Sequence, residues 1–453
     1  MKGKLWLTGI LAILSIAVLA VGWHTAYALR NRVEISEMTL SEGKSAVEGL
    51  EVTLHTQSDC RLHWDSVYPV GQEDGAKTSF YYTAEQSWPF YPYVYNGMCM
   101  DNITSQNRLP KEYSGVYQLL QDVAQRAPAG KTYTETVTLA DYYDTYPLTV
   151  SVGLPNCWYL SGSLMQSNTI QENNDWDKLI QSYFQIPVAA GHQIEVTLQK
   201  NAAGTVTKCE ARAVSEPGPR SESGIQSESV VSDDRCYFTM GPTMDGRLLD
   251  FSGTPGGYGV WCFDYNKERP QAVGTIIRNF YPVDLSQATI EKLGLTPDGK
   301  HLLIVTSKSE RLWLTVLDAA SGELLQKCDL MDFGWQDHMF QIFCQDDVIV
   351  VMCFDGRFTL LTPSDTGYEV AFSSVYRSPD LSDSLVFAFG QGKLAVADAD
   401  DDSESERYRL SVFDATGLLF TGTYRTGGGY YTAHSLLNSS SVSLTWQGTS
   451  DGS

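Results

Sequence analysis

The sequence predicts a mainly β protein built as a β-propeller, and two observations carry that prediction. Gly294–Leu330 contains short apolar runs separated by tight turns, and we expect four strands within it. Looser copies surround this stretch, with entry turns near residues 246, 299, 346, 392 and 438, at successive spacings of about 53, 47, 46 and 46 residues. Four-stranded units that repeat at this period are typical of propeller blades, of which we expect about seven or eight.

The strands of the best-defined repeat are bounded by turn residues. Leu302–Thr306 and Leu312–Leu317 are apolar, β-branched runs flanked by Asp, Ser and Gly. Asp264, Asp318 and Asp414 recur at one position of the repeat. A ring of functional carboxylates is one interpretation of this recurrence. We favour the other, in which each Asp accepts backbone N–H bonds within a tight turn.

Two short motifs of this repeat resemble those of known propellers. The turn Pro297-Asp-Gly-Lys300 and the motif Val316-Leu-Asp-x-x-x-Gly-Glu-Leu-Leu325 are similar to repeats of bacterial propellers of the YVTN and quinoprotein-like type, and looser copies extend over residues 233–453. The sequence departs from the quinoprotein pattern because no Trp follows the turns at Gly322 and Gly417. The resemblance therefore implies a propeller but not quinone binding, and no cofactor is predicted. Propellers serve as enzymes, receptors and scaffolds alike.

The N-terminal segment predicts a membrane anchor. Lys2 and Lys4 precede an apolar run over residues 5–22, whose length of about 18 residues approaches that of a membrane-spanning helix. We therefore expect a single-pass protein of the cell membrane, with residues 1–32 as its anchor and the body on the extracytoplasmic side. The alternative is a signal peptide cleaved near Ala28, which would release a secreted protein.

Composition agrees with a folded body that does not bind nucleic acid. Hydrophobic residues make up 43% of the chain and charged residues 19%, which leaves enough apolar surface for a sizeable core. The formal net charge of −22 disfavours binding to a phosphate backbone. The nine cysteines form no Cys-x-x-Cys pair, which argues against zinc ribbons and thioredoxin-like motifs. Cys262 and Cys353 lie in predicted strands, and the sequence allows each of them to be either part of a disulfide or a buried free thiol.

The region over residues 33–214 is predicted to be β-rich, with an α+β insertion at about 111–214. Within the insertion, Tyr113–Gln125 has apolar residues at helical spacing, and Asp175–Phe184 is a second short helix. Strands are expected at Thr132–Leu139, Leu148–Leu154, Ile186–Leu198 and Val206–Val214. Residues 215–232 are rich in Ser, Glu, Pro and Gly and predict a loop or linker before the repeats at 233–453.

The two ends of the chain are predicted to meet. The last repeat has room for only about two strands before Ser453, so a closed propeller needs strands from elsewhere. Leu50–His55 and Cys60–Trp64 are expected to form a hairpin and are the natural donors. We therefore predict that N-terminal strands pair beside Val442–Trp446.

Three groups of side chains are candidates for binding, each with a structural alternative. Asp398, Asp400 and Asp402 have a spacing that suggests calcium, but the glycine and final glutamate of a calcium loop are absent, and a solvated loop is favoured. His55, Cys60 and His63 would be metal ligands or ordinary strand residues. The aromatic cluster Trp88–Tyr95 would be a carbohydrate platform or strand packing. We predict no metal site.

Two classes of function follow. No nucleophile-elbow, P-loop, zinc-protease or dinucleotide-binding motif is present, which modestly favours a protein without catalysis. The first class is a membrane-anchored binding or sensing platform for an unknown ligand, with a protein or glycan partner. The alternative is a propeller hydrolase, lactonase-like or glycan-cleaving, with carboxylates in the central channel.

Overall fold

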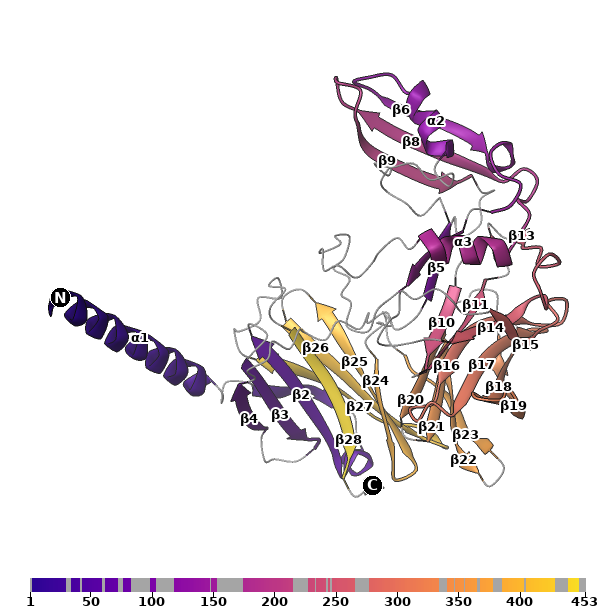
Figure 1. Cartoon of the computed structure of the whole chain (residues 1–453). Helices are drawn as coiled ribbons and strands as arrows, with labels where there is room; N and C mark the ends of the chain where they lie inside the picture. Colours follow the sequence, from indigo (N-terminus) through magenta and orange to yellow (C-terminus); the bar gives the residue numbers. More distant parts are fainter. Residues whose placement is uncertain are drawn as a thin grey trace. The chain divides into compact units, whose positions relative to one another are not determined.

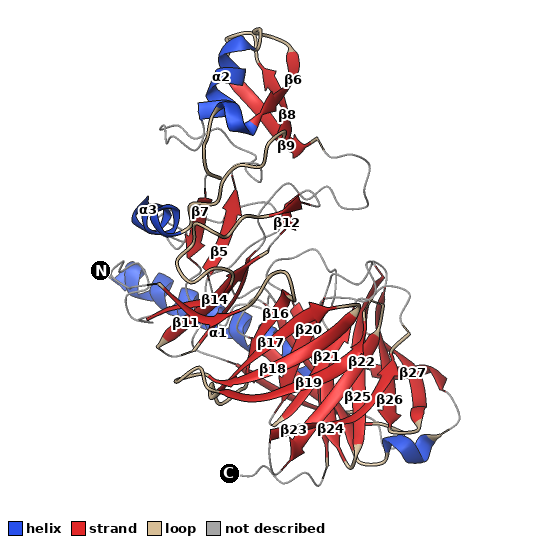
Figure 2. Cartoon of the chain, turned by 90° about the vertical axis from the view of Figure 1, so that its right-hand side faces the viewer, coloured by secondary structure: helices blue, strands red, loops and turns tan. Residues whose placement is uncertain are grey.

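The structure is a computed structural model of the whole chain (Figure 1). It describes residues 2–29, 34–40, 43–58, 62–71, 76–82, 98–102, 118–146, 148–152, 174–214, 227–232, 234–241, 243–244, 247–264, 277–333, 340–345, 347–353, 355–364, 367–377, 385–402, 405–427 and 439–447. Strands dominate these residues (Figure 2). The prediction of a mainly β chain is therefore confirmed.

A single long helix, α1 (Lys2–Leu29), begins the described part of the chain. Among the described residues, none of the helices combines the length and apolar character needed to cross a membrane. The transmembrane helix predicted over residues 5–22 is therefore not supported by the structure.

The best-defined repeat forms one antiparallel sheet of four strands in chain order. The sheet contains β16 (Thr289–Leu295), β17 (His301–Lys308), β18 (Arg311–Asp318) and β19 (Leu324–Asp332). Consecutive residues of β17, from Leu302 to Val305, are fully buried, as expected for a strand covered on both faces. This confirms the four strands predicted for Gly294–Leu330.

The next two repeats give sheets of the same order. One contains β20 (Phe340–Gln345), β21 (Val348–Cys353), β22 (Arg357–Ser364) and β23 (Gly367–Val375). The other contains β24 (Val386–Gly390), β25 (Lys393–Asp402), β26 (Ser405–Asp414) and β27 (Gly417–Gly427), and β1 (Glu34–Leu40) adds a fifth strand beside β27. This succession of four-stranded sheets is the arrangement expected of propeller blades.

The first repeat is displaced from its predicted position. Its sheet contains β10 (Ser227–Val231), β11 (Arg235–Met240), β14 (Gly259–Asp264) and β15 (Arg278–Pro282). The predicted entry turn near residue 246 instead joins two very short strands, β12 (Thr243–Met244) and β13 (Arg247–Leu248), which pair only with each other. The end of the predicted linker at 215–232 is also a strand, because β10 pairs along its length with the buried β11.

Strands from the two ends of the chain share one sheet. It has the order β28 (Ser439–Trp446), β2 (Leu50–Ser58), β3 (Leu62–Pro69) and β4 (Lys77–Tyr82). In the antiparallel pairing of β2 with β28, Val52 lies opposite Leu444, and Leu50 lies opposite Trp446. Both the predicted hairpin and the predicted pairing beside Val442–Trp446 are confirmed.

The remaining elements form the predicted mixture of helices and strands. Helix α2 (Gln118–Arg126) buries Leu119, Leu120 and Val123, as its spacing predicted, and helix α3 (Asn174–Tyr183) lies where the second helix was expected. One sheet contains β6 (Thr132–Thr138), β8 (Gln193–Lys200) and β9 (Val206–Ala213), and another contains β5 (Met98–Asn102) and β7 (Leu148–Val152). Strand β8 begins at Gln193 rather than Ile186. Short 3-10 helices cover Lys44–Val47 and Leu139–Asp141.

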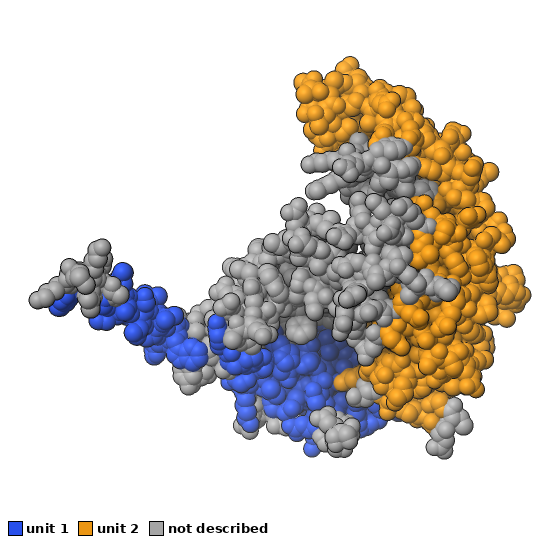
Figure 3. Space-filling view, in the orientation of Figure 1, with its two compact units in different colours: residues 1–92, 354–361, 370–453 blue, residues 93–353, 362–369 orange. Residues whose placement is uncertain are grey.

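Two compact units make up the chain (Figure 3). One contains residues 1–92, 354–361 and 370–453, and the other contains residues 93–353 and 362–369. The sheet that joins the chain ends belongs to the first unit, and the α+β elements belong to the second. The predicted domain boundaries at residues 32, 214 and 232 stay predictions.

Candidate functional site

Three polar side chains come together on the sheet formed by the chain ends. Alternation along β2 turns Val52 and Leu54 toward the core and leaves His55 on the other face. Asp65 of β3 lies directly opposite His55, and Ser443 of β28 lies opposite Thr53, one step along the same face. Three neighbouring strands therefore each place one of these groups on one face.

His55 bridges the other two groups. Its Nδ1 lies 2.8 Å from Asp65 Oδ1, and its Nε2 lies 3.1 Å from Ser443 Oγ. With the proton on Nδ1, the imidazole donates to the carboxylate, and Nε2 accepts the proton of the serine hydroxyl. The side chains of His55 and Asp65 are 42% and 27% exposed, so solvent and a ligand reach them.

This arrangement has the connectivity of a nucleophile, a general base and an orienting carboxylate. A serine hydroxyl is a weak nucleophile until a neighbouring base removes its proton, and the imidazole is placed to do so. The carboxylate holds the tautomer that leaves Nε2 free to accept, and it stabilises the imidazolium that then forms. The structural alternative is a ladder of polar cross-strand pairs on an open sheet face.

The opposite face of the sheet holds the site in place. Leu54, Leu444 and Trp446 are all at least 97% buried. The indole Nε1 of Trp446 donates to the carbonyl of Ala388 in β24 at 3.1 Å. A slip of one residue in β28 would turn Leu444 and Trp446 outward and Ser443 inward, so the burial of these two side chains fixes the register of the nucleophile.

The metal-ligand alternative is not met by His55 and His63, which have other partners. His55 is engaged with Asp65, while His63 stacks on Tyr81, with ring centroids 4.9 Å apart and an interplanar angle of 11°. Cys60 and the aromatic cluster Trp88–Tyr95 lie outside the described residues. Within the described ranges, no group of three or more His, Cys, Asp and Glu side chains could hold a metal ion.

The acidic run after residue 397 is not the predicted loop. β25 continues to Asp402 and pairs with β26, so that Asp398, Asp400 and Asp402 alternate along a strand and share one face. Asp398 is buried, with 3% of its surface exposed. The side chains of Asp400 and Asp402 lie outside the described residues, and the prediction that they form no metal site stays untested.

The recurrent aspartates take the structural role that the sequence favoured. Asp318 Oδ1 accepts the backbone N–H groups of Ala320 at 3.1 Å and Ser321 at 2.7 Å, and Asp414 Oδ1 accepts that of Thr416 at 2.7 Å. The bond from the Ser321 N–H lowers the pKa of Asp318, and the bonds from the hydroxyl and then the N–H of Thr416 lower the pKa of Asp414. The turn after Asp264 lies outside the described residues.

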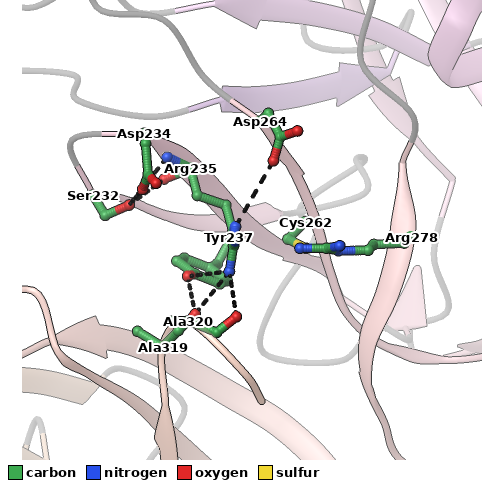
Figure 4. Close-up of polar contacts among 9 residues, drawn as sticks. All are labelled: Ser232, Asp234, Arg235, Tyr237, Cys262, Asp264, Arg278, Ala319 and Ala320. Atoms are coloured by element: carbon green, nitrogen blue, oxygen red, sulfur yellow. Dashed lines mark hydrogen bonds and ion pairs between the residues drawn. The ribbon is translucent and has the colours of Figure 1, made fainter.

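A second polar cluster lies between β11 and the turn after β18 (Figure 4). One terminal nitrogen of Arg235 donates to the carbonyls of Ala319 and Ala320, each at 2.9 Å, and the Tyr237 hydroxyl also donates to Ala319. The Arg235 side chain is only 16% exposed. Its donors are directed at backbone carbonyls, so we assign the cluster a structural role.

Six cysteines are buried or half-buried free thiols: Cys209, Cys236, Cys262, Cys328, Cys344 and Cys353. Arg278 Nε donates to Cys262 Sγ at 3.1 Å, yet burial raises the pKa of this thiol, which favours the unreactive protonated form. Burial likewise raises the pKa of Cys209 to about 11 and that of Cys344 to about 12. For Cys262 and Cys353, the buried-thiol interpretation is confirmed.

Asp65 and Ser443 were not predicted from the sequence as site residues. Ser443 is 388 positions away from His55 and belongs to no catalytic motif. The sequence pattern that could have indicated Ser443 was the predicted pairing beside Val442–Trp446, combined with the alternation of side chains along both strands. That combination places odd-numbered residues of both strands on one face, but it does not give the register.

Comparisons with known proteins identify no family. No family model matches the chain, and no curated protein matches it. The YVTN and quinoprotein-like resemblance therefore stays a prediction at the level of the family.

Solved structures that match the chain include propeller proteins. A putative 6-phosphogluconolactonase from Bacteroides fragilis is 9% identical, with 82% of this chain and 93% of that chain covered and a TM-score of 0.31. The periplasmic gluconolactonase of Pseudomonas aeruginosa is 13% identical, with 81% and 93% covered and a TM-score of 0.30. The β-propeller domain of Swd1 from Myceliophteria thermophila is 9% identical, with 51% and 78% covered and a TM-score of 0.27. Similarities at these values assign neither an activity nor a substrate to this chain.

Proposed function

We propose that the chain is a serine hydrolase that cleaves carboxylic esters, lactones included, with Ser443 as nucleophile, His55 as general base and Asp65 as the orienting carboxylate. The observation that carries the proposal is the continuous contact Asp65–His55–Ser443, with both imidazole nitrogens engaged at 2.8 and 3.1 Å. In a ladder of polar cross-strand pairs, the carboxylate, the imidazole and the hydroxyl could pair in any order. Nucleophilic catalysis requires the order seen here, in which the imidazole lies between the carboxylate and the hydroxyl.

The reaction follows from the positions of the protons. As Ser443 Oγ attacks the ester carbonyl carbon, its proton moves to His55 Nε2, and the carbonyl oxygen takes the negative charge. The imidazolium then returns the proton to the departing alkoxide, which leaves an acyl-serine. Water attacks the acyl-serine, gives one proton to His55 and releases the acid, and the proton passes back to Ser443 Oγ.

The developing oxyanion needs a hydrogen-bond donor close to the nucleophile. Thr53 lies directly opposite Ser443 on the same face, where cross-strand Cβ atoms are about 5 Å apart. Thr53 is half-buried and lies on the same face of β2 as His55, two residues before it. In this proposal the Thr53 hydroxyl donates to the oxyanion.

The first test is covalent labelling with a fluorophosphonate, from which an activated serine displaces fluoride. The full-length protein should be labelled, and peptide mass spectrometry should place the adduct on Ser443. The variants Ser443→Ala and His55→Ala should lose labelling by at least about 100-fold, since a single member of such a relay carries most of the rate. Thr445→Ala, which removes an exposed hydroxyl from the same face of β28, is the matched control and should be labelled normally.

The test should then be repeated with substrates. p-Nitrophenyl esters and δ-lactones should be turned over by the wild type and the Thr445→Ala variant, but not by the Ser443→Ala variant. A wild-type protein that is folded yet unlabelled and inactive would refute the proposal. The binding or sensing role expected from the sequence would then be the remaining hypothesis.

Attachment to a membrane through residues 5–22 stays a separate prediction, with the body outside the cell or released by cleavage near Ala28. Support comes from the large apolar side chains of α1, of which Trp6 is 75% exposed and Leu19 is 72% exposed. Alkaline carbonate extraction of membranes should leave the full chain in the pellet. Recovery of the full chain in the supernatant would contradict attachment.

A further inference from the structure

The nucleophile of the proposed site lies between two polar side chains of β2. Ser443 is directly opposite Thr53, so Glu51 and His55, which share the outward face of β2 with Thr53, are its two diagonal neighbours. Diagonal neighbours on one face of a sheet are about 7–8 Å apart. The His55 side chain crosses this gap and reaches Ser443 Oγ at 3.1 Å. Glu51 has the equivalent position on the other side of the nucleophile.

The Glu51 carboxylate is held in place but forms no ion pair within the part of the chain that the structure describes. Nε2 of Gln447, the residue after β28, donates to Glu51 Oε1 at 2.6 Å. Lys77, which carries a positive charge on the same face, lies opposite Val67, and β3 separates it from β2. The charge of Glu51 is therefore left to be met by solvent or by a ligand.

The proposed reaction fixes the direction in which an ester lies across these residues. His55 returns the proton to the departing alkoxide, so the alcohol part of the ester has to lie on the His55 side of Ser443. The oxyanion lies at Thr53, opposite the nucleophile. The acyl chain, which is the remaining substituent of the carbonyl carbon, therefore extends along β2 away from His55 and toward Glu51.

We propose that Glu51 is the specificity residue of this site and selects esters whose acyl chain carries a cationic group, such as a quaternary ammonium. The diagonal spacing of about 7–8 Å allows an ammonium a few bonds from the carbonyl carbon to meet the carboxylate. The inference rests on the proposed hydrolase function for the placement of the acyl chain, but binding of the cation by Glu51 does not depend on catalysis.

Burial and charge both favour a cation at this position. Glu51 is half-buried, so its field is screened less than that of a fully hydrated carboxylate. The amide of Gln447 holds one carboxylate oxygen, which reduces the rotamer entropy lost when a ligand binds. An anionic acyl chain would be repelled by the same carboxylate. The formal net charge of −22 adds a field that attracts cations to the chain.

The test compares three p-nitrophenyl esters that share one leaving group: the γ-trimethylammoniobutanoate, the neutral compound with carbon in place of its nitrogen, and the anionic glutarate. After division by the rate of uncatalysed hydrolysis, the wild type should favour the cationic ester over the neutral one by about 3- to 10-fold in kcat/KM, with the glutarate slowest. About 1 M salt should largely remove this preference, since the Debye length is then about 3 Å. Glu51→Gln, which keeps the size of the side chain and its contact with Gln447, should bring the cationic-to-neutral ratio to about 1.

Glu48→Gln is the matched control, because it removes an exposed carboxylate in the segment before β2 and changes the net charge by the same amount. This variant should keep both the activity and the preference of the wild type. Glu51→Asp, which keeps the charge, should keep part of the preference. Equal use of the three esters by the wild type, or a preference that survives in Glu51→Gln, would overturn the role of Glu51.

A second measurement needs no catalysis. In the Ser443→Ala background, the NMR signal of the Gln447 side-chain amide reports its hydrogen bond to Glu51; the methyl ester of γ-trimethylammoniobutanoate should shift it, the neutral methyl ester should not, and Glu51→Gln should abolish the difference. A cation-dependent shift in a protein that cleaves no ester would refute the hydrolase and leave cation binding intact. Turnover without the shift or the preference would leave the hydrolase intact and refute the role of Glu51. Absence of both turnover and shift would refute both proposals.

Discussion

Trp446 joins the C-terminal strand to the rest of the first unit, and its removal should be strongly destabilising. The side chain is 2% exposed, and its indole N–H donates to the carbonyl of Ala388 at 3.1 Å. Truncation of a buried Trp to Ala generally costs about 3–5 kcal/mol, which includes the cavity that remains. Trp446→Phe keeps an aromatic ring but leaves the Ala388 carbonyl without this donor, at a cost of about 1–2 kcal/mol.

Gly390 provides an independent check on the same contact. A Cβ atom built at Gly390 would lie 2.6 Å from both Cβ and Cγ of Trp446, closer than real carbon atoms approach. Gly390→Ala should therefore destabilise the wild type by about 1–3 kcal/mol, the usual cost of overpacking. In the Trp446→Ala background the contacts with Cγ and Cδ1 are lost while the one with Cβ stays, so the same change should be less destabilising than in the wild type but not neutral, which couples the two substitutions.

The assay is urea unfolding of the full chain followed by circular dichroism, together with hydrogen exchange of peptides from β2, β24 and β28. The exchange data are needed because two compact units need not unfold in one transition. Thr445→Ala, at an exposed position next to Trp446, is the control and should change stability by less than about 0.5 kcal/mol. A loss below about 1 kcal/mol for Trp446→Ala, or additive effects of Trp446→Ala and Gly390→Ala, would refute the packing described here.

Three further predictions concern the candidate site, the polar cluster around Arg235, and the turn after Asp318. Thr53→Val should lower kcat for ester cleavage by about 10- to 1,000-fold with little change in KM, whereas Thr53→Ser should retain most activity; an equal loss in both would argue against an oxyanion donor. Arg235→Lys should lower thermal stability, because an ammonium group cannot reproduce the guanidinium contacts with two carbonyls, and an unchanged Tm would show that these bonds contribute nothing. The lowered pKa of Asp318 means that its stabilising effect is present above the unfolded-state pKa of about 4 and is lost as pH falls through the lower folded-state value. Asp318→Asn should therefore be less stable than the wild type at pH 7, with a difference that disappears in acid; a pH-independent difference would exclude the charge as its source.

The sequence was sufficient for elements whose signal is local. Leu302–Thr306 and Leu312–Leu317 are apolar, β-branched and bounded by turn residues, so each became a strand. Helix α2 was predictable because its apolar residues recur at helical spacing. The same reasoning failed for the first repeat, because the strands beside Asp245-Gly246 pair with each other and are not part of the four-stranded sheet. The pairing of β10 with β11 depends on long-range burial that a turn motif does not report.

The candidate site could not be predicted in the same way, because it depends on register rather than on composition. Alternation alone places His55 and Ser443 on outward faces, but only the pairing of Leu50 with Trp446 decides which outward residues meet. Asp65 lies in a strand whose sequence is an ordinary alternation of polar and apolar residues, so nothing in that sequence marks it as a site residue. No linear motif joins a serine near the C-terminus to a histidine near the N-terminus.

This dependence on register links the stability of the chain to its proposed chemistry. Ser443 reaches His55 only while β28 stays paired with β2, and Trp446 fixes that pairing from the opposite face of the same strand. Under mild denaturant, Trp446→Ala should therefore lose fluorophosphonate labelling before the circular dichroism signal of the whole chain falls, since local release of one strand separates nucleophile from base. Arg235→Lys, whose contacts lie entirely within the other unit, should lose labelling only with its own global unfolding. If both variants lost labelling and structure together, the nucleophile would not depend on the local pairing of the chain ends.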